Sequence, residues 1–191
     1  MSSKLIIINN ALIRCGADTI TQEELDNPTT KRAKLAVVQF DVTLKELLAD
    51  SPWNFAIKRA VVTKNGTPPV YGYASRYQLP ADCLRVLSMD KCSQPFEVEG
   101  GFIVTNEKSS DIKIQYISHT VEYARYSATF LKALWLGLAS DLSYALVQST
   151  TLQDKIISEA ERFLRKARSY NSQEGTPESR YSDAYTMGIR Q

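Results

Sequence analysis

Residues 47–56 read LLADSPWNFA, and within this stretch the chain changes from a helical pattern to a strand pattern. Before the stretch, apolar side chains recur at three- and four-residue steps, which predicts an amphipathic helix. The helix should end at about Asp50, because Pro52 disfavours helical backbone in the residue before it. The repeating apolar positions are Ala33, Val37, Phe40, Leu44, Leu47 and Leu48.

The part of the chain after Pro52 carries short segments that are rich in β-branched and aromatic residues. Turn residues such as Asn65-Gly66 and Gly100-Gly101 separate them, and residues 112–116 alternate between apolar and polar side chains as a half-buried strand does. We therefore expect a small antiparallel sheet. Its predicted strands are Trp53–Val62, Tyr71–Leu79, Leu84–Met89, Phe96–Val98, Phe102–Thr105 and Ile112–Ile117.

Helical patterns flank the predicted sheet on both sides. An N-terminal helix should end at Gly16, and Ser127 should cap a long apolar helix over residues 128–148. A further helix is predicted over residues 152–170. We expect these helices to share one core that buries Phe40, Leu44, Phe130, Leu134, Trp135 and Phe163.

These patterns together predict an α+β chain in which a four-helix bundle carries an inserted small antiparallel β-sheet domain. The bundle should comprise residues 1–52 and 120–170, and the β domain residues 53–119. Residues 171–191 contain Gly175, Pro177 and many polar side chains, and too few apolar ones to build a core. We expect them to form an extended C-terminal tail.

The composition limits the classes of function. With 23 Lys and Arg against 21 Asp and Glu, the net charge is +2, so no global positive field favours tight nucleic-acid binding. The cysteines Cys15, Cys83 and Cys92 form no C-x-x-C pair, which argues against a disulfide framework or a zinc site. The apolar run over residues 5–8 is too short for a signal peptide or a membrane span. We expect synthesis in the cytosol and no membrane partner.

The supply of reactive side chains is poor. His119 is the only histidine, so no two-histidine metal site can form, and Gly100-Gly101 lacks the G-K-[ST] continuation of a phosphate-binding loop. Glu97 and Glu99 should share a solvent-facing side of a strand, whereas Glu159 and Glu161 should point apart on a helix. The sequence therefore predicts no enzyme, no catalytic or metal-binding residue and no cofactor.

Two other groups of residues leave alternatives open. The cations Arg162, Arg165, Lys166 and Arg168 are either a solvated helix C-terminus or a surface that faces phosphates or an acidic partner. The second group is Tyr71, Tyr73 and Tyr77, which we expect to share one face of a strand. That face is either a stacking platform for single-stranded nucleic acid or, as we prefer, a protein interface. A nucleic-acid-binding module that uses the basic helix and the aromatic strand is the alternative function.

The order of these elements, together with two motifs, resembles a known family. The motifs are W-N-F-A at residues 53–56 and Y-x-L-P-x-D-C-L-R at residues 77–85. They resemble tail tubular protein A of T7-like podoviruses, the head–tail adaptor family also called gatekeepers. The resemblance covers nearly the whole chain in element order, while the N-terminus and the tail match only in character. Neither motif is catalytic; Trp53 and Phe55 would anchor the junction between helices and sheet.

The resemblance implies a structural role. A member of this family would form a dodecameric ring with copies of itself, between the portal protein and a tail nozzle similar to tail tubular protein B. DNA would pass through the ring without sequence-specific contacts, and repetition of Arg162, Arg165, Lys166 and Arg168 would make the channel basic. The protein would be part of the virion at the head–tail junction, after assembly in the host cytoplasm. In the tail, the residues expected to dock to the portal are Tyr181, Tyr185, Met187 and Ile189.

Overall fold

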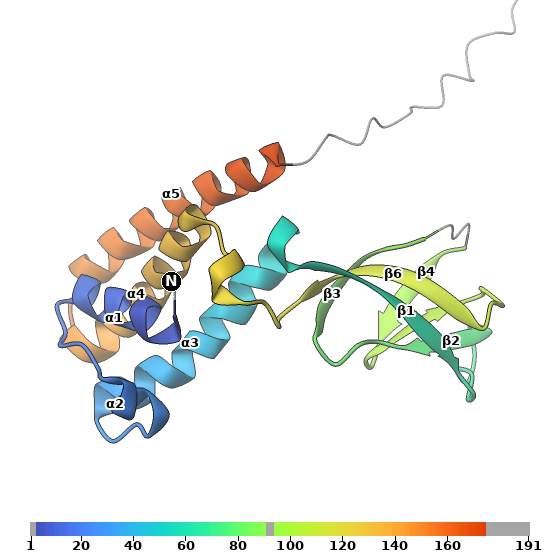
Figure 1. The fold of residues 1–191 in the computed structure, drawn as a ribbon, viewed down its shortest axis with the longest axis horizontal. Coiled ribbons are helices and arrows are strands. Elements are labelled where there is room, and N and C mark those ends of the chain that lie inside the picture. The colour runs from blue at the N-terminus through green and yellow to red at the C-terminus, as the bar shows by residue number, and fades with distance from the viewer. Residues whose placement is uncertain (1–2, 91–93, 175–191) are drawn as a thin grey trace, which may run out of the picture.

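The computed structural model describes residues 3–90 and 94–174 and places helices at one end of the molecule and strands at the other (Figure 1). The α-helices are α1 (Lys4–Cys15), α2 (Gln22–Asp26), α3 (Lys31–Asp50), α4 (Ala128–Val147) and α5 (Thr150–Gln173). The strands are β1 (Ile57–Asn65), β2 (Ser75–Gln78), β3 (Cys83–Met89), β4 (Phe96–Glu99), β5 (Phe102–Thr105) and β6 (Asp111–Ser118). Two short 3-10 helices, Asn54–Ala56 and Tyr123–Arg125, join the two ends.

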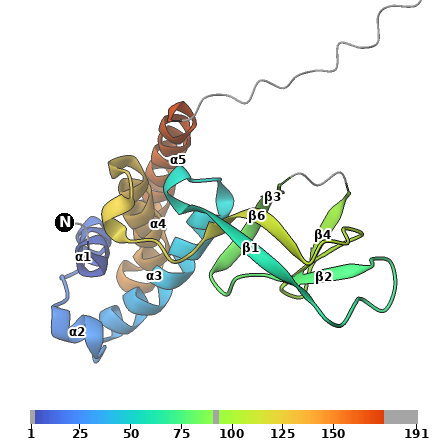
Figure 2. The same cartoon turned by 45° about the vertical axis from the view of Figure 1, so that its right-hand side comes forward.

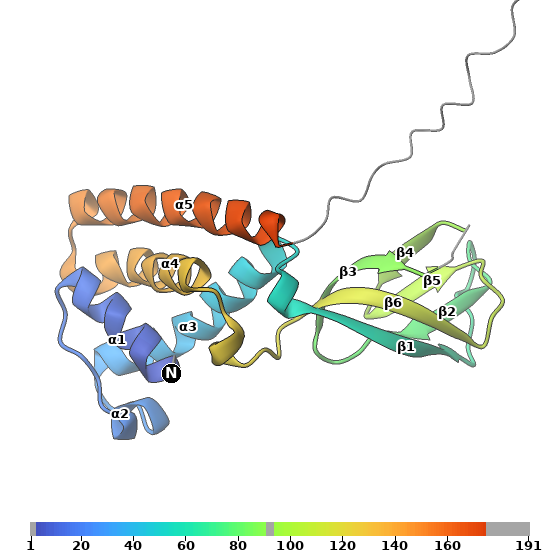
Figure 3. The ribbon, with the colours of Figure 1, turned by 45° about the horizontal axis from the view of Figure 1, so that its top comes forward.

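Helix α4 is the centre of the helical end, and α1, α3 and α5 each pack against it (Figure 3). Its N-cap is Ser127, whose side chain accepts a hydrogen bond from the backbone N–H of Phe130, as the sequence predicted. Helix α4 is long and apolar enough to cross a membrane, with a mean hydropathy of 1.3. Its side chains form the core between the other helices, so packing accounts for this composition.

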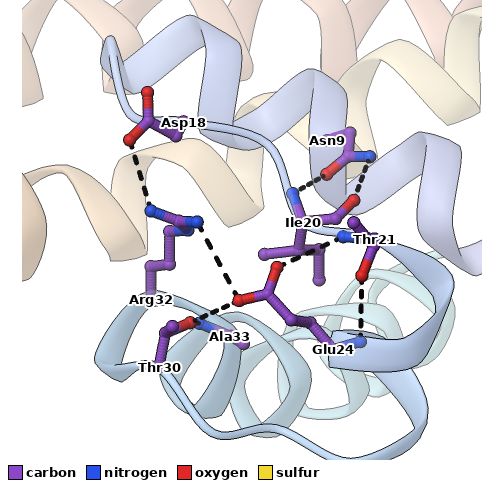
Figure 4. Close-up of polar contacts among 8 residues, drawn as sticks. All are labelled: Asn9, Asp18, Ile20, Thr21, Glu24, Thr30, Arg32 and Ala33. Atoms are coloured by element: carbon purple, nitrogen blue, oxygen red, sulfur yellow. Dashed lines mark hydrogen bonds and ion pairs between the residues drawn. The ribbon is translucent and has the colours of Figure 1, made fainter.

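Helix α1 ends at the predicted glycine. Gly16 adopts the left-handed conformation with φ of 77°, and its N–H bonds back to the last helical turn. The Asn9 side chain then holds the chain that follows, since it donates to the Ile20 carbonyl at 3.0 Å and accepts from the Ile20 N–H at 2.9 Å (Figure 4). These bonds fix the path from α1 to α2.

Helix α2 was not predicted, and a capping box holds its N-terminus. Thr21 accepts from the Glu24 N–H at 3.2 Å, and Glu24 accepts from the Thr21 N–H at 3.3 Å. The same Glu24 carboxylate accepts from the Thr30 hydroxyl at 3.1 Å and lies 3.9 Å from Arg32, which also pairs with Asp18 (Figure 4). Glu24 therefore connects α2 with the start of α3.

The strands form one antiparallel sheet in the order β3-β6-β1-β2-β5-β4. The sheet curls into a nearly closed barrel whose edge strands are β3 and β4. The long strands β1 and β6 pair with Ile57 opposite Ile117 and Thr63 opposite Asp111. The barrel has a core of its own, which consists of Val62, Tyr77, Ile103, Ile112, Ile114 and Tyr116.

The prediction of a four-helix bundle with a small inserted sheet is wrong. The structure is α+β with five helices in its described residues and a six-stranded barrel. The physical reason lies in the packing: α1, α3 and α5 surround α4, whereas a four-helix bundle needs comparable contacts between all neighbouring helices. The sheet is also no small appendage, because it buries a separate core.

The predicted common core of the helices is correct in part. Phe40, Leu44, Phe130 and Leu134 are buried, with exposed fractions of 0 to 8%. Trp135 and Phe163 are only partly buried and border this core. Helix α5 also continues to Gln173, so the first residues of the expected tail belong to a helix.

Candidate functional site

An aromatic cluster joins the helical end to the barrel, where the W-N-F-A motif lies. Trp53 is fully buried, and its indole N–H donates to the Leu47 carbonyl at 2.7 Å. Its ring packs edge-on against Phe130, with 4.9 Å between ring centroids, and stacks on Phe55 at 5.9 Å. Phe55 in turn contacts Tyr126 at 5.2 Å. The predicted role of Trp53 and Phe55 as anchors of this junction is confirmed.

The C-terminal end of α5 is tied to the same junction. The Asn171 side chain accepts from the Asn54 N–H at 2.8 Å and donates to the Pro52 carbonyl at 3.0 Å. One turn earlier, Arg168 forms an ion pair with Asp50 at the end of α3. The sequence offered Asn54 as part of a motif, but no local pattern could pair it with a residue at the far end of α5.

The second motif contains Asp82, whose side chain makes three hydrogen bonds to the barrel. Its carboxylate accepts hydrogen bonds from Lys58 at 2.7 Å, Ser118 at 2.7 Å and Tyr116 at 3.0 Å. Burial would raise the pKa of Asp82, but these hydrogen bonds and the charge of Lys58 outweigh it and hold the pKa at about 2. Asp82 therefore links the loop before β3 to β1 and β6, which is a structural role.

The four predicted channel cations on α5 differ in exposure and in ion pairing. Arg162, Arg165 and Lys166 are exposed, whereas Arg168 is partly buried by its ion pair with Asp50. Arg165 lies 3.8 Å from Glu161 one turn earlier, so its charge is partly neutralised. Arg162 and Lys166 have no ion pair with any residue in the described ranges 3–90 and 94–174.

Aromatic rings lie close to these exposed cations. The centroid of the Phe163 ring lies 5.4 Å from the guanidinium of Arg162 and 4.3 Å from the ammonium of Lys132 on α4. Lys166 lies 5.6 Å from the Tyr170 ring. Lys132 adds a cation that the sequence pattern did not single out, because the pairing of α4 with α5 had to be known first. We call Lys132, Arg162 and Lys166 the cationic strip.

The predicted tyrosine face does not exist. Strand β2 begins only at Ser75, so Tyr71 and Tyr73 precede it and the alternation rule does not reach them. Tyr77 is fully buried in the barrel core, whereas Tyr71 is 88% exposed. The hypothesis that these three rings form a stacking platform is therefore wrong.

Of the groups that could carry chemistry, Cys83 and His119 are neighbours, since Cys83 pairs with Ser118 and the His119 N–H donates to the Asp82 carbonyl at 3.0 Å. Cys15 is buried, its thiol donates to the Ala139 carbonyl at 3.2 Å, and burial raises its pKa to about 11. Cys83 is partly buried, which raises the pKa of its thiol as well. His119 follows β6 and is partly exposed, as predicted. Within residues 3–90 and 94–174, no three His, Cys, Asp or Glu side chains come close enough to hold a metal ion.

Cys92 and the proposed portal-docking residues Tyr181, Tyr185, Met187 and Ile189 lie outside the described residues. No model of a known protein family matches the chain, and a search of curated proteins found no match either.

Proposed function

We propose that the chain is a structural subunit of a phage head–tail connector ring, an adaptor between portal and tail nozzle through which DNA passes. The observation that carries this proposal is the cationic strip on α4 and α5, in a chain that is otherwise nearly neutral. Its Arg162 and Lys166 are exposed, its Lys132 is half-buried, and none of the three has an acidic partner within the described residues. A single copy offers few charges, but a ring would repeat the strip around one channel.

Such a channel suits DNA that must slide. Cations on a rigid helix attract phosphates through a sequence-independent term that depends strongly on salt. Side chains that read base edges would hold the DNA at particular sequences, so contacts limited to the backbone favour passage. The cationic strip offers long side chains that lie close to aromatic rings.

The junction also supports a structural role. Trp53 belongs to the same buried core as Ile117 of β6, and Asn171 of α5 bonds to Pro52 and Asn54 directly before β1. A ring subunit must keep its shape while partners bind to opposite ends, and a stiff connection provides this. The alternative function, a nucleic-acid-binding module, loses its aromatic strand because Tyr77 is buried.

Electron microscopy tests the proposal directly. The purified chain, alone and mixed with the portal protein of the same virus, should form rings that attach coaxially to the portal. Mass measurement separates the alternative, since a nucleic-acid-binding module would bind DNA as a monomer. A chain that stays monomeric with and without the portal would contradict the connector role.

A further inference from the structure

The outer side of the barrel carries an exposed surface that the proposed function does not use. A hollow of about 670 Å³ lies between the loop that joins β1 to β2 and the edge strand β4. Val70 at the tip of the loop is 100% exposed and Tyr71 is 88% exposed. Large apolar side chains gathered at a protruding tip are typical of a protein interface.

Acidic side chains border this tip. Glu97 and Glu99 on β4 are exposed, and neither has an ion pair in the part of the chain that the structure describes. The Tyr73 hydroxyl hydrogen-bonds to Glu97, which raises the pKa of Tyr73. One cation lines the hollow, Arg76, and it lies flat over the Phe102 ring at 4.6 Å. We call Val70, Tyr71, Glu97 and Glu99 the barrel tip.

Helix α3 carries a complementary stripe on its exposed face. Val38 is 67% exposed and Val42 43% exposed, although the buried face of the same helix is complete without them. Lys34 and Lys45 flank the two valines, and the spacing of the four residues places them on one side of the helix. Asp41 lies on the same side, where its charge is compensated by an ion pair with Lys4 at 2.8 Å. Lys34 and Lys45 are exposed, and no ion pair involves them among the described residues. We call Lys34, Val38, Val42 and Lys45 the α3 stripe.

We propose that the barrel tip of one copy of this chain docks on the α3 stripe of the next copy. The two surfaces match in kind, since each presents two apolar side chains with two charges beside them, and the charges have opposite sign. In Figures 1 and 2 the loop between β1 and β2 lies at the end of the molecule that points away from the helices. One copy therefore cannot place its barrel tip on its own stripe.

This contact joins two different surfaces and is therefore head-to-tail. Head-to-tail contacts produce a closed ring when the rotation between copies closes, whereas identical surfaces that face each other produce a dimer. The inference rests on the proposed ring and names the surfaces that would hold it together. The proposed contact leaves the cationic strip free for DNA, because the cationic strip lies on α4 and α5, whereas the α3 stripe lies on α3.

Charge reversal tests the contact. Glu97→Lys with Glu99→Lys on the barrel tip, and Lys34→Glu with Lys45→Glu on the stripe, should each weaken self-association by about tenfold or more, because like charges then face each other. All four positions are exposed, so the fold should persist in both variants. The matched control, Arg162→Glu with Lys166→Glu, reverses two exposed cations outside the contact and should assemble as the native chain does. Sedimentation velocity measures assembly in each case.

Mixing the two weakened variants gives the sharpest result. In a mixture, each reversed barrel tip meets a reversed stripe and each native barrel tip meets a native stripe, so rings should return with the variants in alternation. Rings that form unchanged in both variants would overturn this contact while the connector role stands. Absence of rescue on mixing would also overturn it. A native chain that remains monomeric at high concentration and in the presence of its portal would overturn both the contact and the connector role.

Discussion

Asp82 shows how a single side chain can connect neighbouring strands of the barrel. Three donors from β1 and β6 converge on its carboxylate, although the residue itself lies in the loop before β3. Because the carboxylate is stabilised in its charged form, its pKa falls from the ordinary value of 3.8 to about 2 in the folded protein. The folded state therefore gains stability from Asp82 only where the carboxylate is ionised.

Asp82→Asn should lower the free energy of unfolding near neutral pH by about 1 to 2 kcal/mol, a figure reduced for partial exposure of the side chain. The sign follows from the lowered pKa: the contribution is complete above the unfolded value and disappears as the pH falls from about 4 to about 2. Denaturant unfolding at several pH values should show the two proteins converging in acid. Asp90→Asn, an exposed aspartate at the end of β3, is the control and should differ little from the native chain at any pH.

Among the elements, the ones that could be predicted from the sequence are those with a strong local pattern. The strands from Cys83 onward lie within one or two residues of their predictions, because alternation and turn residues mark both ends. Helix α2 was not predicted, although the T-x-x-E capping box from Thr21 to Glu24 is visible in the sequence. The helix has only five residues, which is too short for a repeating pattern of apolar side chains to show. The prediction that Tyr71, Tyr73 and Tyr77 share one face of a strand was wrong, because the start of β2 depends on its pairing with β5.

The junction elements lead to a prediction about two tryptophans. Trp53 is fully buried and donates to Leu47, whereas Trp135 is only partly buried with Lys132 over its ring at 5.5 Å. Trp53→Ala should therefore cost about 3 to 5 kcal/mol of stability, and Trp135→Ala less than about 2 kcal/mol. Hydrogen exchange should also show that Trp53→Ala loosens β1 and α4 together. Equal losses in the two variants would mean that the aromatic cluster does not couple the two ends of the molecule.

At the scale of the whole molecule, the arrangement could not be predicted because it depends on contacts between residues far apart in the chain. Strand β1 pairs with β6 across the intervening strands, and α1 packs on α4 rather than on its neighbour in sequence. Local patterns report which segments are helices or strands, but not which surfaces meet. The candidate site follows the same rule: Arg162 and Lys166 were found from the sequence, whereas Lys132 and the ion pair of Arg168 required the packing of α5.

The cationic strip leads to the last prediction. Arg162→Glu with Lys166→Glu should leave the fold and the rings intact, because both side chains are exposed and lack ion pairs within the described chain. DNA binding to the assembled ring should fall by about tenfold or more at low salt, and its dependence on salt should become shallower, because fewer counterions are released. Lys64→Glu with Lys113→Glu makes the same change of charge on the barrel and should retain native DNA affinity. Competition with DNA of different sequences should show no preference, since backbone contacts carry no sequence information. If both pairs of substitutions weaken binding equally, only the net charge of the ring matters and the strip does not line the channel.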